Sequence, residues 1–345
     1  MSRRALAVLA VLAVLGALAA CTSESADPIA PGAPLQDTGR DAIGELFLPV
    51  LASESISQVT SCDVPDVPPQ DSLNVSIRQY YVANGQKLKM DVYWPKPQGW
   101  RGRTWTGPRP IVMIIHGGGW RSGSRTGFRD EARLLAGQGY VAATIDHREA
   151  SAGVNTFPAA VEDVRCAVRY LRANAAGLNG DPTRLGVIGE SSGGHVASML
   201  GVAADVAGLD GSCPIAGSPA VDAVVSYYGP QDLRDAAILP NLQSEVTNFL
   251  GATPAQDPAK AALASPIVHV HAGAPPFLFL HRNVDNIVPT LHSQRMKAAL
   301  EAVGVPATLV LLNEAGHGFA MFKERPKFLA TSCTSLAFLA QELQP

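Results

Sequence analysis

The sequence predicts an α/β protein whose sheet is twisted and mostly parallel, with about eight strands and helices on both faces. Two observations predict this class. Short apolar runs suited to buried strands alternate with amphipathic helical patterns along most of the chain. Before them, residues 76–82 and 87–93 flank Asn84-Gly85, a dipeptide that favours a type I′ turn. The sheet is therefore expected to begin with an antiparallel hairpin and to continue with parallel strands.

The remaining elements are expected in a regular order. Buried strands are predicted where apolar runs can pack on both sides, at residues 111–115, 141–145, 185–188, 223–227, 277–280 and 308–312. Helices are predicted between and after them, at residues 128–137, 158–174, 192–203, 289–302 and 326–343. A shorter helical pattern at residues 242–250 lies within residues 229–277, which we interpret as a modest cap above the carboxyl ends of the strands.

The first residues have the pattern of a bacterial export signal. Two arginines precede an apolar run, residues 5–17, that is short for a transmembrane helix. The run ends at residues 18–21, which resemble the lipobox, a motif whose cysteine is lipidated. We therefore expect residues 1–20 to be a lipoprotein signal peptide, and acyl chains on Cys21 to anchor the protein to a membrane of the bacterial cell envelope. The alternative is an ordinary signal peptide and a secreted protein.

The chain after Cys21 is expected to be a tether that leads to one folded domain. Residues 22–38 are rich in Ala, Pro, Ser and Asp and have no periodic apolar pattern, and prolines interrupt the chain again before residue 71. We interpret residues 21–70 as the lipidated cysteine with a flexible tether, and residues 71–345 as the folded domain.

The composition argues against one class of partner. The whole chain has 27 basic and 30 acidic residues, and its basic residues do not cluster. A nucleic-acid partner would require a concentrated positive surface, so none is predicted.

Four cysteines remain after Cys21, and an even number in an exported protein favours disulfides. Their spacing is not that of a metal site, and four cysteines allow three pairings, among which the sequence does not choose. Cys166 also lies in a helical stretch where a small buried residue would serve equally well. The four are Cys62, Cys166, Cys213 and Cys333.

The stretch from Gly189 to Gly193 is predicted to present a nucleophile. It has the pattern Gly-x-Ser-x-Gly, between the predicted strand at residues 185–188 and the helix that follows. The glycines allow a turn so tight that Ser191 projects between strand and helix, because a Cβ at either glycine would meet the neighbouring backbone. Ser192 is expected to contribute only its backbone N–H.

Three glycines directly follow the predicted strand at residues 111–115, and a tryptophan follows them. Consecutive glycines allow peptide N–H groups to converge on one point, as an oxyanion requires. We expect the N–H groups of Gly117, Gly118 and Ser192 to form such a site. Trp120 is expected to wall and shorten an acyl pocket; the alternative is that it packs against the sheet edge and that the pocket is long.

Asp285 and His317 each follow a predicted strand near the C-terminus. A serine hydroxyl becomes a good nucleophile when a neutral imidazole takes its proton and a carboxylate orients that imidazole. The order Ser191, Asp285, His317 is the order of the α/β-hydrolases. Asp232 is a competing acid, but a role as a helix N-cap would explain it.

The other histidines are not predicted to act chemically. His269 and His271 alternate like metal ligands, yet no carboxylate or cysteine accompanies them. His116 and His195 are interpreted as structural hydrogen-bonding residues. No metal and no cofactor are predicted.

From about Val75 onwards the chain resembles the α/β-hydrolase superfamily. Within it, the HGGG, GxSxG and late HG motifs resemble those of hormone-sensitive-lipase-like and feruloyl-esterase-like carboxylesterases. Three features depart from the usual pattern: His147 stands in place of a tyrosine, Glu190 and Ser192 replace aspartate and alanine, and Arg282 replaces a glycine before the predicted acid. We expect Asn283 to be able to supply a left-handed turn in place of that glycine.

The resemblance implies a serine carboxylesterase that hydrolyses short-acyl esters, from acetyl to butyryl, through an acyl-enzyme. Its partner would be a small-molecule ester. An arylformamidase or peptidase using the same three residues is a second possibility. A third is a surface lipoprotein that binds a ligand without catalysis. The sequence makes no prediction of oligomeric state.

Overall fold

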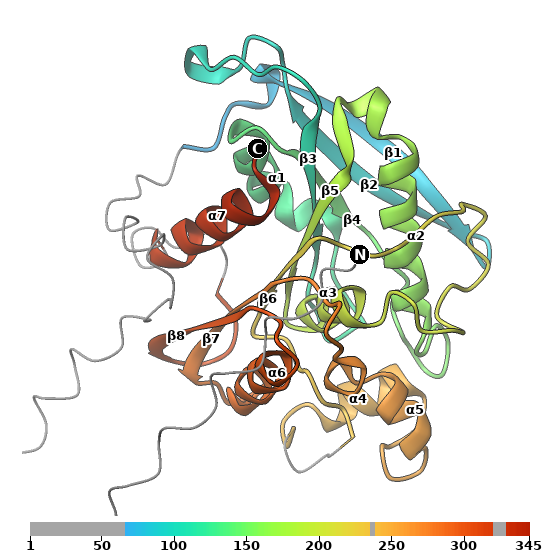
Figure 1. Cartoon of the computed structure of the whole chain (residues 1–345). Helices are drawn as coiled ribbons and strands as arrows, with labels where there is room; N and C mark the ends of the chain where they lie inside the picture. The colour runs from blue at the N-terminus through green and yellow to red at the C-terminus, as the bar shows by residue number, and fades with distance from the viewer. Residues whose placement is uncertain (1–65, 235–238, 320–328) are drawn as a thin grey trace, which may run out of the picture. The chain divides into compact units, whose positions relative to one another are not determined.

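A computed structural model describes residues 66–234, 239–319 and 329–345. Its centre is an eight-stranded sheet in the order β1-β2-β4-β3-β5-β6-β7-β8 (Figure 1). The two pairings that involve β2 are antiparallel and the others are parallel, which confirms the predicted fold class. The strands are β1 (Leu73–Ala83), β2 (Gln86–Pro95), β3 (Arg109–Ile115), β4 (Val141–Ile145), β5 (Gly180–Glu190), β6 (Ala223–Tyr227), β7 (Phe277–Val284) and β8 (Ala307–Ala315).

Helices cover both faces of this sheet. One core contains apolar side chains of α1 and α7, and the other contains those of α2, α3, α4 and α6. Successive residues of β3 point into the two cores in turn, which explains its uninterrupted apolar sequence. The helices are α1 (Arg129–Gly137), α2 (Ala159–Ala173), α3 (Ser192–Val202), α4 (Gln243–Leu250), α5 (Pro258–Leu263), α6 (Leu291–Ala302) and α7 (Leu329–Leu343).

The register of the sheet brings the predicted functional segments together in pairs. Ile115 at the end of β3 pairs with Gly189 of β5, so the glycine loop and the serine turn leave neighbouring strands side by side. In the same way, Val284 of β7 pairs with Ala315 of β8, two strands whose following segments carry Asp285 and His317.

The cap region contains one helix that the sequence analysis did not predict. α5 has six residues, too few to show a helical period, but it has a clear start signal. Asp257 precedes it, and its carboxylate accepts the backbone N–H of Lys260 at 2.9 Å. Pro258 occupies the first turn, where its missing N–H costs nothing.

One disulfide joins two described cysteines, Cys166 of α2 and Cys213 in the segment after α3. Their sulfur atoms are 2.10 Å apart. Cys166 is therefore cross-linked and is more than a small buried residue in a helix. Cys333 of α7 is also disulfide-bonded.

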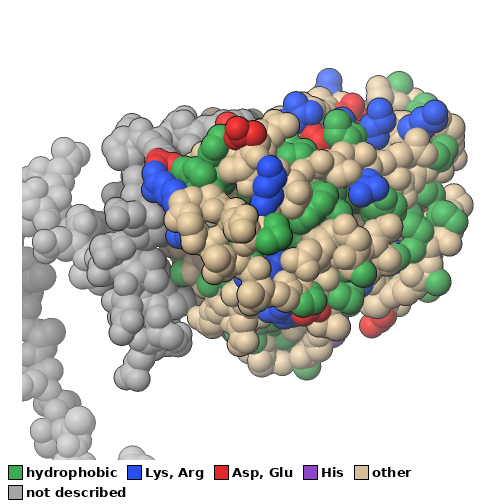
Figure 2. Space-filling view, turned by 90° about the horizontal axis from the view of Figure 1, so that it is seen from above, with side chains coloured by type: hydrophobic (Ala, Val, Ile, Leu, Met, Phe, Trp, Pro, Cys, Tyr) green, Lys and Arg blue, Asp and Glu red, His purple; other side chains and the backbone are tan. Residues whose placement is uncertain are grey.

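Several predictions concern residues outside the described ranges, namely the signal peptide, Cys21, most of the tether and Cys62. Within the described ranges, no helix has both the length and the apolar character needed to cross a membrane. On the face shown in Figure 2, basic side chains are interspersed with acidic, apolar and other polar groups.

Candidate active site

Ser191 lies in the turn between β5 and α3 with a strained backbone, at φ 52° and ψ −119°. Such a conformation costs a residue with a Cβ about 1–3 kcal/mol and persists only where the surroundings enforce it. Here the backbone N–H of Ser191 donates to the carbonyl of Tyr227 at 2.9 Å, and its carbonyl accepts the N–H of His195 at 3.0 Å. The turn is thus fixed from the neighbouring strand β6 and from the first turn of α3.

The two glycines of the motif allow close backbone contacts, both within this turn and between the turn and the end of β3. A Cβ added to Gly189 would lie 2.1 Å from the carbonyl oxygen of Gly193. A Cβ added to Gly193 would lie 2.3 Å from the carbonyl oxygen of Ile115 at the end of β3. Because these are backbone contacts, no side-chain movement could relieve them, which is the physical reason for glycine at both positions.

The structure brings together the three residues predicted to act as nucleophile, base and acid. The Oγ atom of Ser191 lies 3.0 Å from Nε2 of His317, and Nδ1 of His317 lies 2.7 Å from Oδ2 of Asp285. A carboxylate can only accept, so Nδ1 of His317 donates to it. Nε2 of the neutral ring is then free to accept the proton of the Ser191 hydroxyl.

Asp285 is held as a carboxylate by its surroundings. Burial acts to raise the pKa of this group, but hydrogen bonds from His281 and His317 outweigh burial and hold the pKa well below its usual value. Its second oxygen, Oδ1, accepts the N–H groups of Ile287 and Val288 at 2.9 and 3.0 Å. The carboxylate is therefore both charged and fixed in orientation at neutral pH.

His281 is a site residue that the sequence analysis missed. It is fully buried, and its Nε2 lies 3.4 Å from Oδ2 of Asp285 while donating to the carbonyl of Val288 at 2.8 Å. Nδ1 accepts the hydroxyl proton of Ser293 at 2.8 Å. The only available signal was a histidine directly after the apolar run of β7.

Two expectations about the acid are resolved by the geometry. Asp232, the competing acid, is bound by Arg234, whose guanidinium lies 2.7 Å from its carboxylate. Asn283 was expected to be able to supply a left-handed turn, but it does not do so, because its φ is not positive. β7 instead continues through Arg282 and Asn283 to Val284, so the chain turns only afterwards and needs no glycine at residue 282.

The glycine loop after β3 lies directly against the serine turn. A Cβ on Gly117 would be 3.3 Å from Cβ of Ser191 and 2.8 Å from the carbonyl oxygen of Glu190. Gly118 has φ 120°, which favours glycine. The hydrogen bonds found among the described residues do not use the N–H groups of Gly117, Gly118 or Ser192. The N–H groups predicted to bind an oxyanion are thus carried by two turns that lie against each other.

Trp120 does not wall the open cleft as expected from the sequence. Its side chain is 1% exposed and stacks on Phe249 of α4, with the ring centroids 4.5 Å apart. Its indole N–H donates to Nδ1 of His195 at 3.1 Å. The tryptophan belongs to the layer beneath the cleft, so it gives no direct measure of acyl-chain length.

Ser191 and His317 open onto a cleft of about 1030 Å³. Polar and apolar side chains share its lining, and an ion pair between Arg121 and Glu245, 3.5 Å apart, joins the glycine loop to α4. The lining also includes Gly117, Gly118, Gly119, Ser122, Ser124, Thr126, Phe128, Glu190, Tyr228, Asn241, Leu242 and Ile287.

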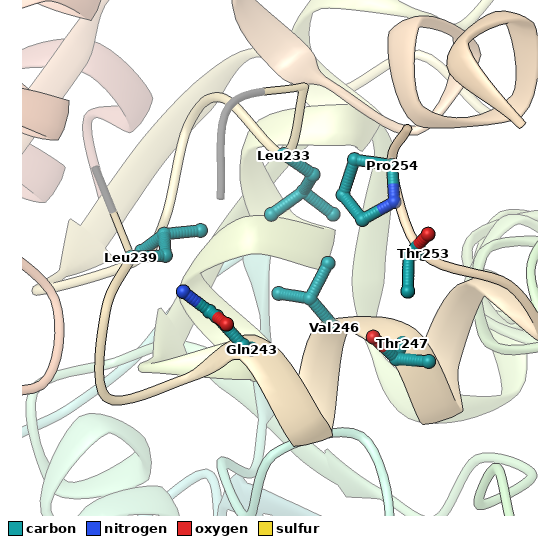
Figure 3. Close-up of a pocket in the computed structure, with 7 residues that line it drawn as sticks. All are labelled: Leu233, Leu239, Gln243, Val246, Thr247, Thr253 and Pro254. Atoms are coloured by element: carbon teal, nitrogen blue, oxygen red, sulfur yellow. The ribbon is translucent and has the colours of Figure 1, made fainter. Parts of the chain in front are cut away.

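A second, much smaller cavity of about 50 Å³ adjoins another face of α4 (Figure 3). Its walls are mainly apolar, and Leu233, Leu239, Val246 and Pro254 supply much of them. None of the three predicted catalytic residues lines it. Ser191 and His317 line the larger cleft and not this cavity.

The remaining predicted histidines have structural partners. His116 stacks on His147 with centroids 4.3 Å apart, and burial, reinforced by His147, lowers the pKa of His116 to about 4. His269 lies 2.8 Å from the carbonyl of Leu263. Nδ1 of His271 accepts a backbone N–H. In the described part of the chain, no group of three or more His, Cys, Asp or Glu side chains is arranged to hold a metal ion.

Comparison with known proteins places this arrangement in a family. Residues 90–300 match the family BD-FAE. The chain is 34% identical to Esterase LipC of Mycobacterium tuberculosis over 222 residues, which cover 62% of this chain and 54% of the relative. It is 31% identical over 252 residues to the probable carboxylic ester hydrolase LipM of the same organism, covering 69% of this chain and 55% of the relative. The chain thus spans about half the length of these curated relatives.

Solved esterase structures share the fold. A thermophilic esterase from Thermogutta terrifontis, Est2, superposes with a TM-score of 0.63 at 27% identity, covering 79% of this chain and 94% of that one. A truncated carbohydrate esterase from gut microbiota gives a TM-score of 0.62 at 25% identity, covering 81% and 100%. The matched residues, the sheet order and the serine turn lead to one assignment: the chain belongs to the BD-FAE family and has the α/β-hydrolase fold of carboxylesterases.

Proposed function

We propose that this protein is a serine carboxylesterase that hydrolyses short-acyl esters through an acyl-enzyme. The observation that carries the proposal is the continuous relay from Ser191 through His317 to Asp285, at 3.0 and 2.7 Å, with the serine opening onto a large cleft. The esterase relatives and structures support the same reaction class.

In the first half of the reaction, Nε2 of His317 takes the hydroxyl proton of Ser191 while Oγ attacks the ester carbonyl carbon. The N–H groups of Gly117, Gly118 and Ser192 stabilise the oxyanion of the tetrahedral intermediate. His317 then gives its proton to the alcohol oxygen as the carbon–oxygen bond breaks, which leaves the acyl group on Ser191.

In the second half, water takes the place of the alcohol. His317 removes a proton from water, the hydroxide attacks the acyl carbonyl carbon, and His317 returns the proton to Oγ of Ser191 as the acid leaves. Asp285 stays ionised throughout and stabilises the imidazolium that forms twice in each cycle.

The mixed polar and apolar lining of the cleft supports a short acyl group and a polar or aromatic alcohol. A buried acyl methylene contributes about 0.8 kcal/mol only where it meets an apolar wall, and the large aliphatic or phenyl side chains in this lining are limited to Phe128, Leu242 and Ile287. The Thermogutta terrifontis esterase has been solved with butyrate and with propionate bound, and another structural neighbour is a carbohydrate esterase.

A series of p-nitrophenyl esters tests this substrate proposal. We expect kcat/KM to be highest from acetyl to butyryl and to fall steeply by decanoyl. An optimum at dodecanoyl or longer, or activation at an oil–water interface, would contradict it. Formanilides and peptides in the same screen would reveal an arylformamidase or a peptidase.

We also propose that the mature protein is a lipoprotein of the bacterial cell envelope, anchored through Cys21. The Cys166–Cys213 disulfide supports export, because disulfides persist in oxidising compartments. When expressed in a bacterium with its own leader, the protein should partition into detergent and carry an acylated N-terminus, and Cys21→Ser should abolish both. If mass spectrometry identified an unmodified N-terminus at a residue other than Cys21, the proposed lipid anchor would be refuted.

A further inference from the structure

Trp120 has a backbone conformation that its own chemistry disfavours. Its φ is 59°, in the left-handed region, and it follows Gly118 and Gly119 at 120° and 62°. A bulky residue there costs about 1–3 kcal/mol and persists only where the surrounding structure enforces it. Only Gly119 separates Trp120 from Gly118, so the backbone position of Trp120 constrains the loop that carries the N–H groups of Gly117 and Gly118.

The side chain of Trp120 is held by one polar partner, His195. The indole N–H donates to Nδ1 of His195 at 3.1 Å. Nε2 of His195 lies 2.7 Å from the carbonyl of Ala264, which can only accept, so Nε2 carries the proton. Both ring nitrogens are therefore used, and each has a fixed role as acceptor or donor.

His195 must be neutral to make both bonds. It is completely buried, and burial lowers its pKa to about 4. A protonated ring would present a donor to the indole N–H and would lose the bond to Trp120. Near neutral pH the ring is thus a permanent acceptor for Trp120.

His195 also lies where three parts of the candidate site meet. It is in the first turn of α3, and its backbone N–H donates to the carbonyl of Ser191 at 3.0 Å. Its ring is at right angles to Phe249 of α4, with centroids 5.5 Å apart, and Phe249 stacks on Trp120. One buried ring therefore connects the serine turn, the glycine loop and the cap.

We propose that His195 is a positioning residue that acts through Nδ1: by fixing Trp120, it holds the N–H groups of Gly117 and Gly118 where the oxyanion forms. The inference rests on the proposed esterase function. An oxyanion exists only in the transition state and intermediates, so the loss should appear in kcat, with KM little changed.

Two substitutions separate the two ring nitrogens. The amide oxygen of asparagine can occupy the place of Nδ1 and accept from Trp120, whereas the amide nitrogen of glutamine can occupy the place of Nε2 and donate to Ala264. We expect His195→Gln to lower kcat by roughly 10- to 100-fold, as a misplacement of about 1 Å does, and His195→Asn to lower it much less. Phenylboronic acid, which forms a tetrahedral adduct with a reactive serine, should bind His195→Gln more weakly by a similar factor.

Trp120→Phe is an independent test of the proposal, because it removes the donor of the hydrogen bond between Trp120 and His195 and leaves His195 in place. It should reproduce the kcat loss of His195→Gln, and the double variant should lose little more than either single variant. His269→Gln is the matched control, since His269 also lies against a backbone carbonyl, that of Leu263, and is only partly buried.

The measurements are kcat, KM and Tm with p-nitrophenyl acetate. Equal losses of kcat in His195→Asn and His195→Gln, or a fall in Tm without a fall in kcat, would overturn the positioning role. These outcomes differ from failure of the proposed function, in which the wild-type protein itself would show no hydrolysis that depends on Ser191.

Discussion

Asp285 differs from the other nearby acid in what its carboxylate contacts. Its Oδ2 accepts from His317, whereas the carboxylate of Asp232 is bound by Arg234. Asp285→Asn removes the charge that stabilises the imidazolium and favours the wrong tautomer of His317. We expect kcat to fall by about 10⁴-fold, as in other triads. Asp232→Asn should reduce kcat only mildly, and the reverse ranking would reassign the acid.

The depressed pKa of Asp285 predicts a pH dependence of stability. Hydrogen bonds outweigh burial and lower the folded-state pKa below the unfolded value of about 3.9, so the unfolded chain takes up the proton first. The carboxylate's contribution to the free energy of unfolding is therefore complete above the unfolded-state pKa. It is lost as pH falls towards the folded-state pKa. We expect the difference in unfolding free energy between wild type and Asp285→Asn, measured with urea, to become smaller as the pH is lowered from 7 to 3. A difference that stays constant would contradict this assignment.

Single residues also mark the limit of prediction from sequence. Ser191, Asp285 and His317 could be predicted because their motifs follow apolar runs whose ends meet at one edge of a parallel sheet. The position of the Trp120 side chain could not be predicted. It depends on a left-handed backbone and on His195, a partner 75 residues away in the sequence.

The elements were predictable where burial on both faces imposes an apolar run. The strands at residues 141–145 and 223–227 were predicted with the bounds that the structure shows. β5 is longer than predicted because polar residues extend it, and Gly180 pairs with Arg109 of β3. Such extensions depend on the neighbouring strand, which the sequence of β5 alone does not contain.

At the junction of β5 and α3, a substitution of Gly193 tests how closely the serine turn packs against the end of β3. A Cβ there would lie 2.3 and 2.5 Å from the carbonyl oxygens of Ile115 and His116, both backbone atoms. Gly193→Ala should therefore displace the turn, lower Tm and greatly reduce kcat. Gly177→Ala is the control, because an added Cβ there meets nothing within 4 Å. Equal behaviour of the two variants would show that the junction is less tightly packed than described.

For the whole molecule, the disulfide between Cys166 and Cys213 should stabilise the fold without serving catalysis. It joins residues 47 positions apart and ties α2 to the segment after α3, where Asp210 also pairs with Arg165 and Arg169. Replacing both cysteines by alanine should cost about 2–4 kcal/mol of unfolding free energy while kcat changes little. A large loss of kcat at temperatures where the variant is still folded would show that the disulfide also affects the catalytic site.

The most direct test of the central claim is to identify the atom that becomes covalently modified. The protein would be treated with a fluorophosphonate, digested and mapped by mass spectrometry, alongside Ser191→Ala and Ser192→Ala. We predict one label, on Ser191, in the wild type and in Ser192→Ala, with loss of esterase activity in proportion to labelling, and no label in Ser191→Ala. Labelling of Ser192, or full esterase activity in Ser191→Ala, would contradict the assignment of the nucleophile.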